Sequence, residues 1–174
     1  MLTSKKIIDA INQQIGNEFG ASLQYASIAA HFAAESLPQL AQHFYKQSDE
    51  ERDHAMRFIN YVIDAGGRVE IPAIKAPQAR FKFAEDAVKL SLKNEIEVTR
   101  QINDLMDLAL KENDHITANF LQWFLKEQLE EVSSMQELLK IVQRAGEGGL
   151  LNVEQYLAGP GTSLGLHAPE GEKE

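Results

Sequence analysis

The segment Ser48-Asp49-Glu50-Glu51-Arg52-Asp53-His54 carries the residue pair with the clearest potential for chemistry. Glu51 and His54 are three positions apart, so on a helix both side chains project from one face, one turn from each other. A carboxylate and an imidazole therefore stand where packing would favour leucine, and together they would supply two ligands to a metal ion. The same face is otherwise apolar, with Leu40, Phe44, Phe58 and Ala65.

Apolar residues at helical spacing predict four long helices that position this pair, followed by a short one. Ser4 can cap the first helix, Pro38 suits the first turn of the second, and the glycines after Ala65 end that second helix. No glycine-rich nucleotide loop and no strand alternation interrupts the pattern. The predicted helices cover residues 4–35, 37–65, 84–112, 115–145 and 150–158.

The stretch from Arg68 to Phe83 contains Pro72 and Pro77 and has no helical period. It is long for a connection within a compact domain, and when extended it could span a whole bundle. We interpret it as a crossover that leaves the second and third helices parallel. The predicted fold is therefore all-α: residues 1–160 form a four-helix bundle with a long crossover and a short fifth helix, and residues 161–174 form a flexible C-terminal tail.

Composition excludes several classes of protein. The 174 residues are 44% hydrophobic and 25% charged, with a net charge of -9 and no cysteine. No apolar run approaches the roughly 20 residues of a membrane span. Disulfides and cysteine-based zinc or iron–sulfur sites are ruled out, and the negative charge argues against nucleic acid or an anionic membrane as partner. We expect a cytoplasmic protein that tolerates cations.

Carboxylates on the other helices lie at the same level as the Glu51/His54 pair. The predicted helices are centred near residues 19, 52, 97 and 129. In a bundle of similar helices these midpoints share one level. Four inward carboxylate positions and one imidazole are therefore expected to converge, from Glu18, the Glu51/His54 pair, Glu95 and the Glu127/Glu131 region.

Each of these residues alone has a simpler interpretation. A single glutamate is more often a solvated surface charge, and a single His54 is more often a hydrogen-bonded core histidine. Burying several carboxylates together without compensation would cost more than the whole stability of a domain, about 5–15 kcal/mol. Such a cluster either takes up protons or binds cations. A site rich in carboxylates suits iron or manganese better than structural zinc, and Glu51 could bridge two ions.

These motifs resemble the ferritin family, specifically its haem-free bacterial and archaeal branch, over roughly residues 5–158. The resemblance is closest to the actinobacterial ferritins in Leu37-Pro-Gln-Leu-Ala-Gln-His-Phe-Tyr45 and in the turn Arg68-Val-Glu-Ile-Pro72. The remaining matches are Asn17-Glu18 with Tyr25, Glu50-Glu51-x-x-His54, Glu95, and Asn119-Phe-Leu-Gln-Trp-Phe-Leu-Lys-Glu127-Gln128-x-Glu130-Glu131.

The resemblance implies iron storage with ferroxidase activity at a di-iron centre in each subunit, using O2 or H2O2 as oxidant. Glu18, Glu51 and His54 would hold the first iron, with Glu51 bridging. Glu95, with Gln128 or Glu131, would hold the second. Tyr25 would hydrogen-bond near the centre and could donate an electron. A third iron site would use Glu50, Glu127 and Glu130 and share Glu131.

The resemblance further implies a hollow homo-oligomer of twenty-four subunits, with the fifth helix at the fourfold axis. Bacterioferritins repeat Glu-x-x-His on the fourth helix and bind haem through a Met after the bridging Glu. Here Glu130 stands in place of that His and Arg52 in place of that Met, so no haem is expected. Animal ferritins line their threefold pores with acids where this chain has Ala118 and Leu121, so their iron route cannot be carried over.

Two other functions remain open at this level. The first is a di-iron redox enzyme without storage, such as a rubrerythrin-like peroxide reductase, although that family carries two Glu-x-x-His pairs and usually a cysteine-rich module. The second is a metal-free helical scaffold, which would need another partner for the buried carboxylates.

Overall fold

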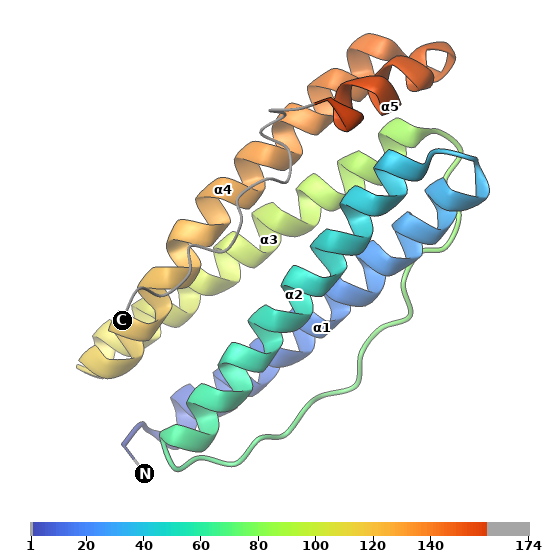
Figure 1. Ribbon diagram of the computed structural model, residues 1–174. Coiled ribbons are helices and arrows are strands. Elements are labelled where there is room, and N and C mark those ends of the chain that lie inside the picture. Colours follow the sequence, from blue (N-terminus) through green and yellow to red (C-terminus); the bar gives the residue numbers. More distant parts are fainter. Residues whose placement is uncertain (1, 160–174) are drawn as a thin grey trace.

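The computed structural model describes residues 2–159 as helices joined by short turns and one long connection (Figure 1). Each helix begins and ends within one residue of its predicted boundary. The predicted flexible tail, residues 161–174, lies outside the described residues. The elements are α1 (Lys5–Ala34), α2 (Pro38–Asp64), α3 (Ala84–Lys111), α4 (His115–Ala145), a 3-10 turn η1 (Glu147–Gly149) and α5 (Leu150–Ala158).

Local chemistry explains where the helices begin. The Ser4 hydroxyl accepts a hydrogen bond from the Ile7 amide at 3.3 Å, and the Asp114 carboxylate accepts one from the Thr117 amide at 2.9 Å. Both are N-terminal caps, and the sequence predicts the one at Ser4. Asn113, in the turn between α3 and α4, has a φ of 56°, a left-handed conformation that asparagine tolerates better than most residues. No helix in residues 2–159 is both long and apolar enough to cross a membrane.

The N-termini of α2 and α3 are capped from a distance, by the C-terminal segment. Neither helix has a side-chain cap from its own N-cap residue. Glu154 of α5 instead accepts hydrogen bonds from the amides of Gln39 and Leu40 at 2.7 and 2.9 Å. Glu147 of η1 accepts one from the Ala84 amide at 2.8 Å. Each carboxylate satisfies free amides at the positive end of a helix dipole, which joins α5 and η1 to the bundle.

The connection between Asp64 and Ala84 is a crossover, as predicted, and α2 and α3 run parallel (Figure 1). Two side-chain amides of α1 each donate one hydrogen bond to the backbone of this crossover and accept one from it. Asn12 donates to the Arg68 carbonyl at 2.9 Å and accepts from the Glu70 amide at 3.1 Å. Gln24 donates to the Gln78 carbonyl at 2.9 Å and accepts from the same residue's amide at 2.8 Å. The crossover is therefore held along α1 at both ends.

Gly16 of α1 lies directly under Pro72 of this crossover. A Cβ on Gly16 would come within 2.9 Å of Pro72 Cδ and closer still to Cγ, whereas one on Gly20 would lie 3.8 Å from Ile74 Cγ2, an ordinary contact. We predict that Gly16→Ala destabilises the protein by about 1–3 kcal/mol through overpacking. Gly20→Ala is the matched control and should gain up to about 1 kcal/mol of helix propensity.

Denaturant midpoints of the two variants against the wild-type protein measure both effects. A Gly16→Ala protein as stable as Gly20→Ala would contradict the close approach of Pro72 to α1.

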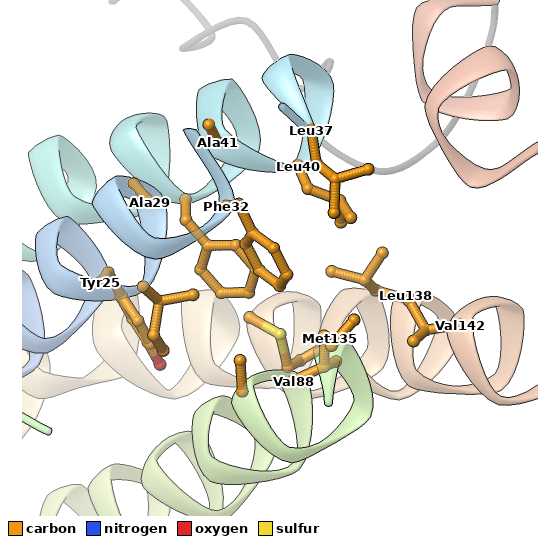
Figure 2. Packing of buried hydrophobic residues seen from close by; sticks show 14 of the residues in the cluster. Tyr25, Ala29, Phe32, Leu37, Leu40, Ala41, Val88, Met135, Leu138 and Val142 are labelled. Atoms are coloured by element: carbon orange, nitrogen blue, oxygen red, sulfur yellow. The ribbon is translucent and has the colours of Figure 1, made fainter. Parts of the chain in front are cut away.

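The hydrophobic core is divided into two clusters along the bundle. One includes Phe32, Phe44 and Leu138 and extends to the end capped by α5 (Figure 2). The other includes Ile11, Phe58 and Phe124 and fills the opposite half. On every long helix the two clusters leave a gap of several residues near the midpoint. Those gaps hold the polar residues singled out by the sequence.

Candidate metal centre

The gap between the two apolar clusters is filled by buried acids and one imidazole from all four long helices. Glu18 comes from α1, Glu51 and His54 from α2, and Glu95 from α3; their exposed fractions are 0%, 1%, 4% and 0%. Glu131 comes from α4, with its side chain 10% exposed. The predicted convergence at one level is thus seen in the structure.

The ligand atoms of these residues form two groups that share one member. Glu18, Glu51 and His54 each offer an atom within 4.8 Å of the other two, and so do Glu51, Glu95 and Glu131. His54 Nδ1 lies 3.4 Å from Glu51 Oε2, and His54 Nε2 lies 3.8 Å from Glu131 Oε1. Glu51 therefore stands between two potential cation positions.

Several carboxylate oxygens at this level are buried without a hydrogen-bond partner. They are Glu18 Oε2, Glu95 Oε2 and both oxygens of Glu51. An unpartnered buried carboxylate is costly, and protonation or a bound cation removes that cost. Because the free oxygens belong to the two ligand groups, the donor set fits two cations with oxygen-rich coordination.

The other oxygens are oriented by hydrogen bonds. Gln14 Nε2 donates to Glu18 Oε1 at 2.8 Å, and the Tyr25 hydroxyl donates to Glu95 Oε1. Gln128 Nε2 donates to Glu131 Oε2, while its Oε1 accepts from the Thr99 hydroxyl at 2.8 Å. Gln128, predicted as a ligand, thus lies beside the second group with its amide engaged by two neighbours.

Burial disfavours charge throughout the centre. It raises the pKa of Glu18 to about 7 and, with the neighbouring carboxylates, raises the pKa values of Glu51 and Glu131 well above their usual range. Burial also raises the pKa of Glu95, although the Tyr25 hydrogen bond opposes that change. For His54, burial and then the charge of Arg57 lower the pKa to about 4. A neutral imidazole is the form that binds metals.

An aromatic side chain packs against His54, and a cationic side chain packs on that aromatic ring. The Trp123 ring meets the imidazole edge-to-face with centroids 5.4 Å apart, and the Arg57 guanidinium lies 3.9 Å from the Trp123 ring centroid. This is cation–π geometry. Trp123 therefore packs against one side of His54, and Arg57 packs on the Trp123 ring.

The residues predicted for a third site lie at the margin of this centre. Glu50, Glu127 and Glu130 are half-buried and lie outside the two ligand groups. Glu50 accepts a hydrogen bond from Gln47 and has Lys46 Nζ at 3.5 Å. Burial, and then the charges of Glu130 and Glu50, raise the pKa of Glu127. Glu50 and Glu130 are therefore close enough to Glu127 to act on it electrostatically.

The sequence analysis assigned one wrong residue to the inner face of the fourth helix and missed two residues that hydrogen-bond to the centre. It put Glu127 on the inner face of the fourth helix, whereas the structure buries Gln128 there and leaves Glu127 half-buried. It did not identify Gln14 or Thr99. Gln14 could have been found, because it lies one helical turn before Glu18 on the same face. Ala118 and Leu121, at the positions of the animal pore acids, are buried inside the bundle.

Comparison with known proteins identifies similar sequences and folds. The family model for a ferritin-like domain matches residues 8–145. Ferritin BfrB of Mycolicibacterium smegmatis is 47% identical over 148 residues, covering 85% of this chain and 81% of the relative. Ferritin BfrB of Mycobacterium tuberculosis is 41% identical over 166 residues, covering 92% and 91%. These two relatives bear out the expected resemblance to actinobacterial ferritins.

A more distant relative and a solved structure are also ferritins. The bacterial non-heme ferritin of Staphylococcus aureus is 36% identical over 146 residues, covering 84% of this chain and 88% of that protein. The open pore ferritin of Archaeoglobus fulgidus superposes with a TM-score of 0.87 and 31% identity, covering 90% of this chain and 97% of that one. All four proteins are named as ferritins, which favours storage over the peroxide-reductase alternative.

Proposed function

The chain belongs to the ferritin family and is an iron-storage protein, and we propose that its buried centre is a ferroxidase site with two Fe(II) ions as substrate. The observation that carries the proposal is the position of Glu51, a member of both ligand groups with neither of its oxygens hydrogen-bonded. A carboxylate in that position can bridge two ions. Two bridged ions can pass two electrons to one oxidant.

The proposed ligands follow the two groups. Glu18, Glu51 and His54 hold one Fe(II), and Glu51, Glu95 and Glu131 hold the other. Gln128 is a further ligand of the second ion when its carbonyl turns away from Thr99. The four carboxylates carry four negative charges when ionised, which balance two divalent ions in a largely buried site. Charge balance thus favours loading with two Fe(II).

The proposed reaction is the oxidation of both ions by O2 or H2O2. Each Fe(II) gives up one electron, so that O2 and two protons yield hydrogen peroxide. Carboxylate ligands stabilise Fe(III) over Fe(II) and so favour electron loss. The buried Tyr25, which donates a hydrogen bond to Glu95, is positioned to supply a further electron.

Storage requires a route away from the centre and a cavity to receive the product. We propose that Glu50, Glu127 and Glu130 hold a third iron at the margin of the site, sharing Glu131. Subunits assemble into a hollow homo-oligomeric shell, which family membership suggests contains twenty-four copies with α5 at the fourfold axis. Two large hydrophobic side chains on the outer face of α5, Leu151 at 72% and Tyr156 at 42% exposed, support its burial against other copies.

Mixing metal-free protein with Fe(II) in air tests the proposal. We expect ferric absorbance to rise much faster than in buffer alone, and to rise only after an oxidant is admitted to an anaerobic mixture. Parallel reactions with O2 and H2O2 determine the oxidant, and light scattering determines the size of the shell. Ferric absorbance that rises at the rate of protein-free buffer would rule out a ferroxidase centre.

A further inference from the structure

We propose that Gln14 is the positioning residue for Glu18, and that Asn17 fixes which end of the Gln14 amide faces that carboxylate. The inference rests on the proposed function, because Glu18 is one of its ligands. It goes beyond that function because it makes a residue on the protein surface control the orientation of a buried ligand.

Gln14 hydrogen-bonds one oxygen of Glu18 and leaves the other oxygen free. Gln14 is 2% exposed, and its Nε2 donates to Glu18 Oε1 at 2.8 Å. Glu18 Oε2 is buried and accepts no hydrogen bond. One oxygen is thereby held by the protein while the other stays free for a cation. Glu18 is prepared as a ligand that binds through a single oxygen.

Gln14 can donate this hydrogen bond to Glu18 in only one of the two orientations of its amide. Its two ends are almost equal in size, but only the nitrogen end donates a hydrogen bond to a carboxylate. A reversed amide would place its carbonyl oxygen against Glu18 and repel it. Asn17 prevents the reversal, because its Nδ2 donates to Gln14 Oε1 at 3.1 Å. The oxygen of Gln14 is held toward Asn17, so the nitrogen faces Glu18.

Asn17 is in turn held from α3. The same Nδ2 donates to Gln101 Oε1 at 3.0 Å, so both of its hydrogens are engaged. Gln101 Nε2 donates to Glu97 Oε1 at 3.2 Å. Asn17, Gln101 and Glu97 all line an exposed groove of about 730 Å³ beside the crossover. A continuous chain of hydrogen bonds therefore runs from this groove to the buried ligand.

Asn17→Asp distinguishes this orientation effect from simple electrostatics. A carboxylate at position 17 cannot donate to Gln14, so the Gln14 amide turns its nitrogen toward Asp and its oxygen toward Glu18. We expect Co(II), a redox-stable probe, to bind about tenfold more weakly, in line with the effect of losing a ligand's supporting partner. Simple electrostatics predicts the opposite, because an added negative charge attracts a cation.

Binding is measured by quenching of Trp123 fluorescence. Trp123 is the chain's one tryptophan, and its ring centroid lies 5.4 Å from that of His54. The charge control is Gln13→Glu, an exposed position on the same turn of α1 that lines the same groove. It adds the same negative charge without touching the amide orientation. We expect it to bind Co(II) at least as tightly as the wild-type protein.

A double-mutant cycle locates the effect at Gln14. Gln14→Leu should weaken Co(II) binding by about tenfold, and adding Asn17→Asp to it should cause no further loss, because Asn17 acts only through Gln14. Additive losses, or wild-type affinity in Asn17→Asp, would overturn the inference. A wild-type protein that does not bind Co(II) at the centre would instead contradict the proposed function.

Discussion

Replacing Glu51 with Gln is expected to lower the initial rate of Fe(II) oxidation at least about 100-fold. Glu51 is the one side chain in both ligand groups, so its loss affects both ions together. Losing a residue that merely supports a ligand already costs about 10- to 100-fold in affinity or activity. Gln keeps the volume of the side chain and removes its charge, which separates the loss of a ligand from the loss of packing.

Asp53→Asn is the matched control for this variant. It makes the same carboxylate-to-amide change on α2, at an exposed position outside the ligand groups. Its oxidation rate should equal that of the wild-type protein. Stopped-flow absorbance at several Fe(II) concentrations measures both variants, and size-exclusion chromatography verifies that both assemble normally. Retention of more than a tenth of the wild-type rate in Glu51→Gln would show that the two ions do not share this bridge.

The second large effect concerns the metal-free protein, which should lose stability as the pH rises above about 6.5. Burial raises the pKa of Glu18 from 4.5 to about 7, so the folded protein keeps a proton that the unfolded chain has lost. The stability from this proton is on the order of 3 kcal/mol below pH 4.5 and is lost as the pH rises to 7; about 1 kcal/mol of it remains at pH 6.5 and is lost above that pH. Glu51 and Glu131, whose pKa values are also raised well above their usual range, act in the same direction.

Two histidines oppose this trend, but only at lower pH. Burial lowers the pKa values of His43 and His54 from 6.5 to about 4, so the folded protein binds fewer protons than the unfolded chain between those values. Their contribution rises with pH up to 6.5 and is then constant. Above pH 6.5 the carboxyl groups alone set the slope, and it is downward.

Guanidinium chloride midpoints between pH 4.5 and 8.5, at fixed protein concentration, test this prediction. Glu18→Gln carries no charge at position 18 and should exceed the stability of the wild-type protein at pH 8 while matching it near pH 4.5. Excess Co(II) should reverse the wild-type slope, because a bound cation favours the ionised carboxylates. A metal-free protein whose stability rises between pH 6.5 and 8.5 would contradict the protonation of this cluster.

The sequence was sufficient to predict the helices and the level at which the acids meet. Apolar periodicity and a cap such as Ser4 are local signals, and the midpoints of four similar helices must lie at one level. The angular position of a residue far along α4 was harder to predict. Successive helical residues are about 100° apart, so an error of one position exchanged Glu127 for Gln128 on the inner face.

The supporting contacts could not be predicted in this way. Thr99 reaches Gln128, and Asn17 reaches Gln101, only because the helices pack at a particular distance and rotation. The same is true of Glu147 and Glu154, whose partners are 63 and up to 115 positions away in the chain. Such pairs depend on the tertiary arrangement, and no pattern within one helix specifies them.

The carboxylates of Glu147 and Glu154 also impose an order on how the protein forms. α2 and α3 are synthesised well before the segment that completes their N-termini, so a growing chain holds two helices whose first amides lack these partners. Docking of α5 supplies the Glu154 carboxylate to α2, and it also sets the position of the exposed side chains of Leu151 and Tyr156.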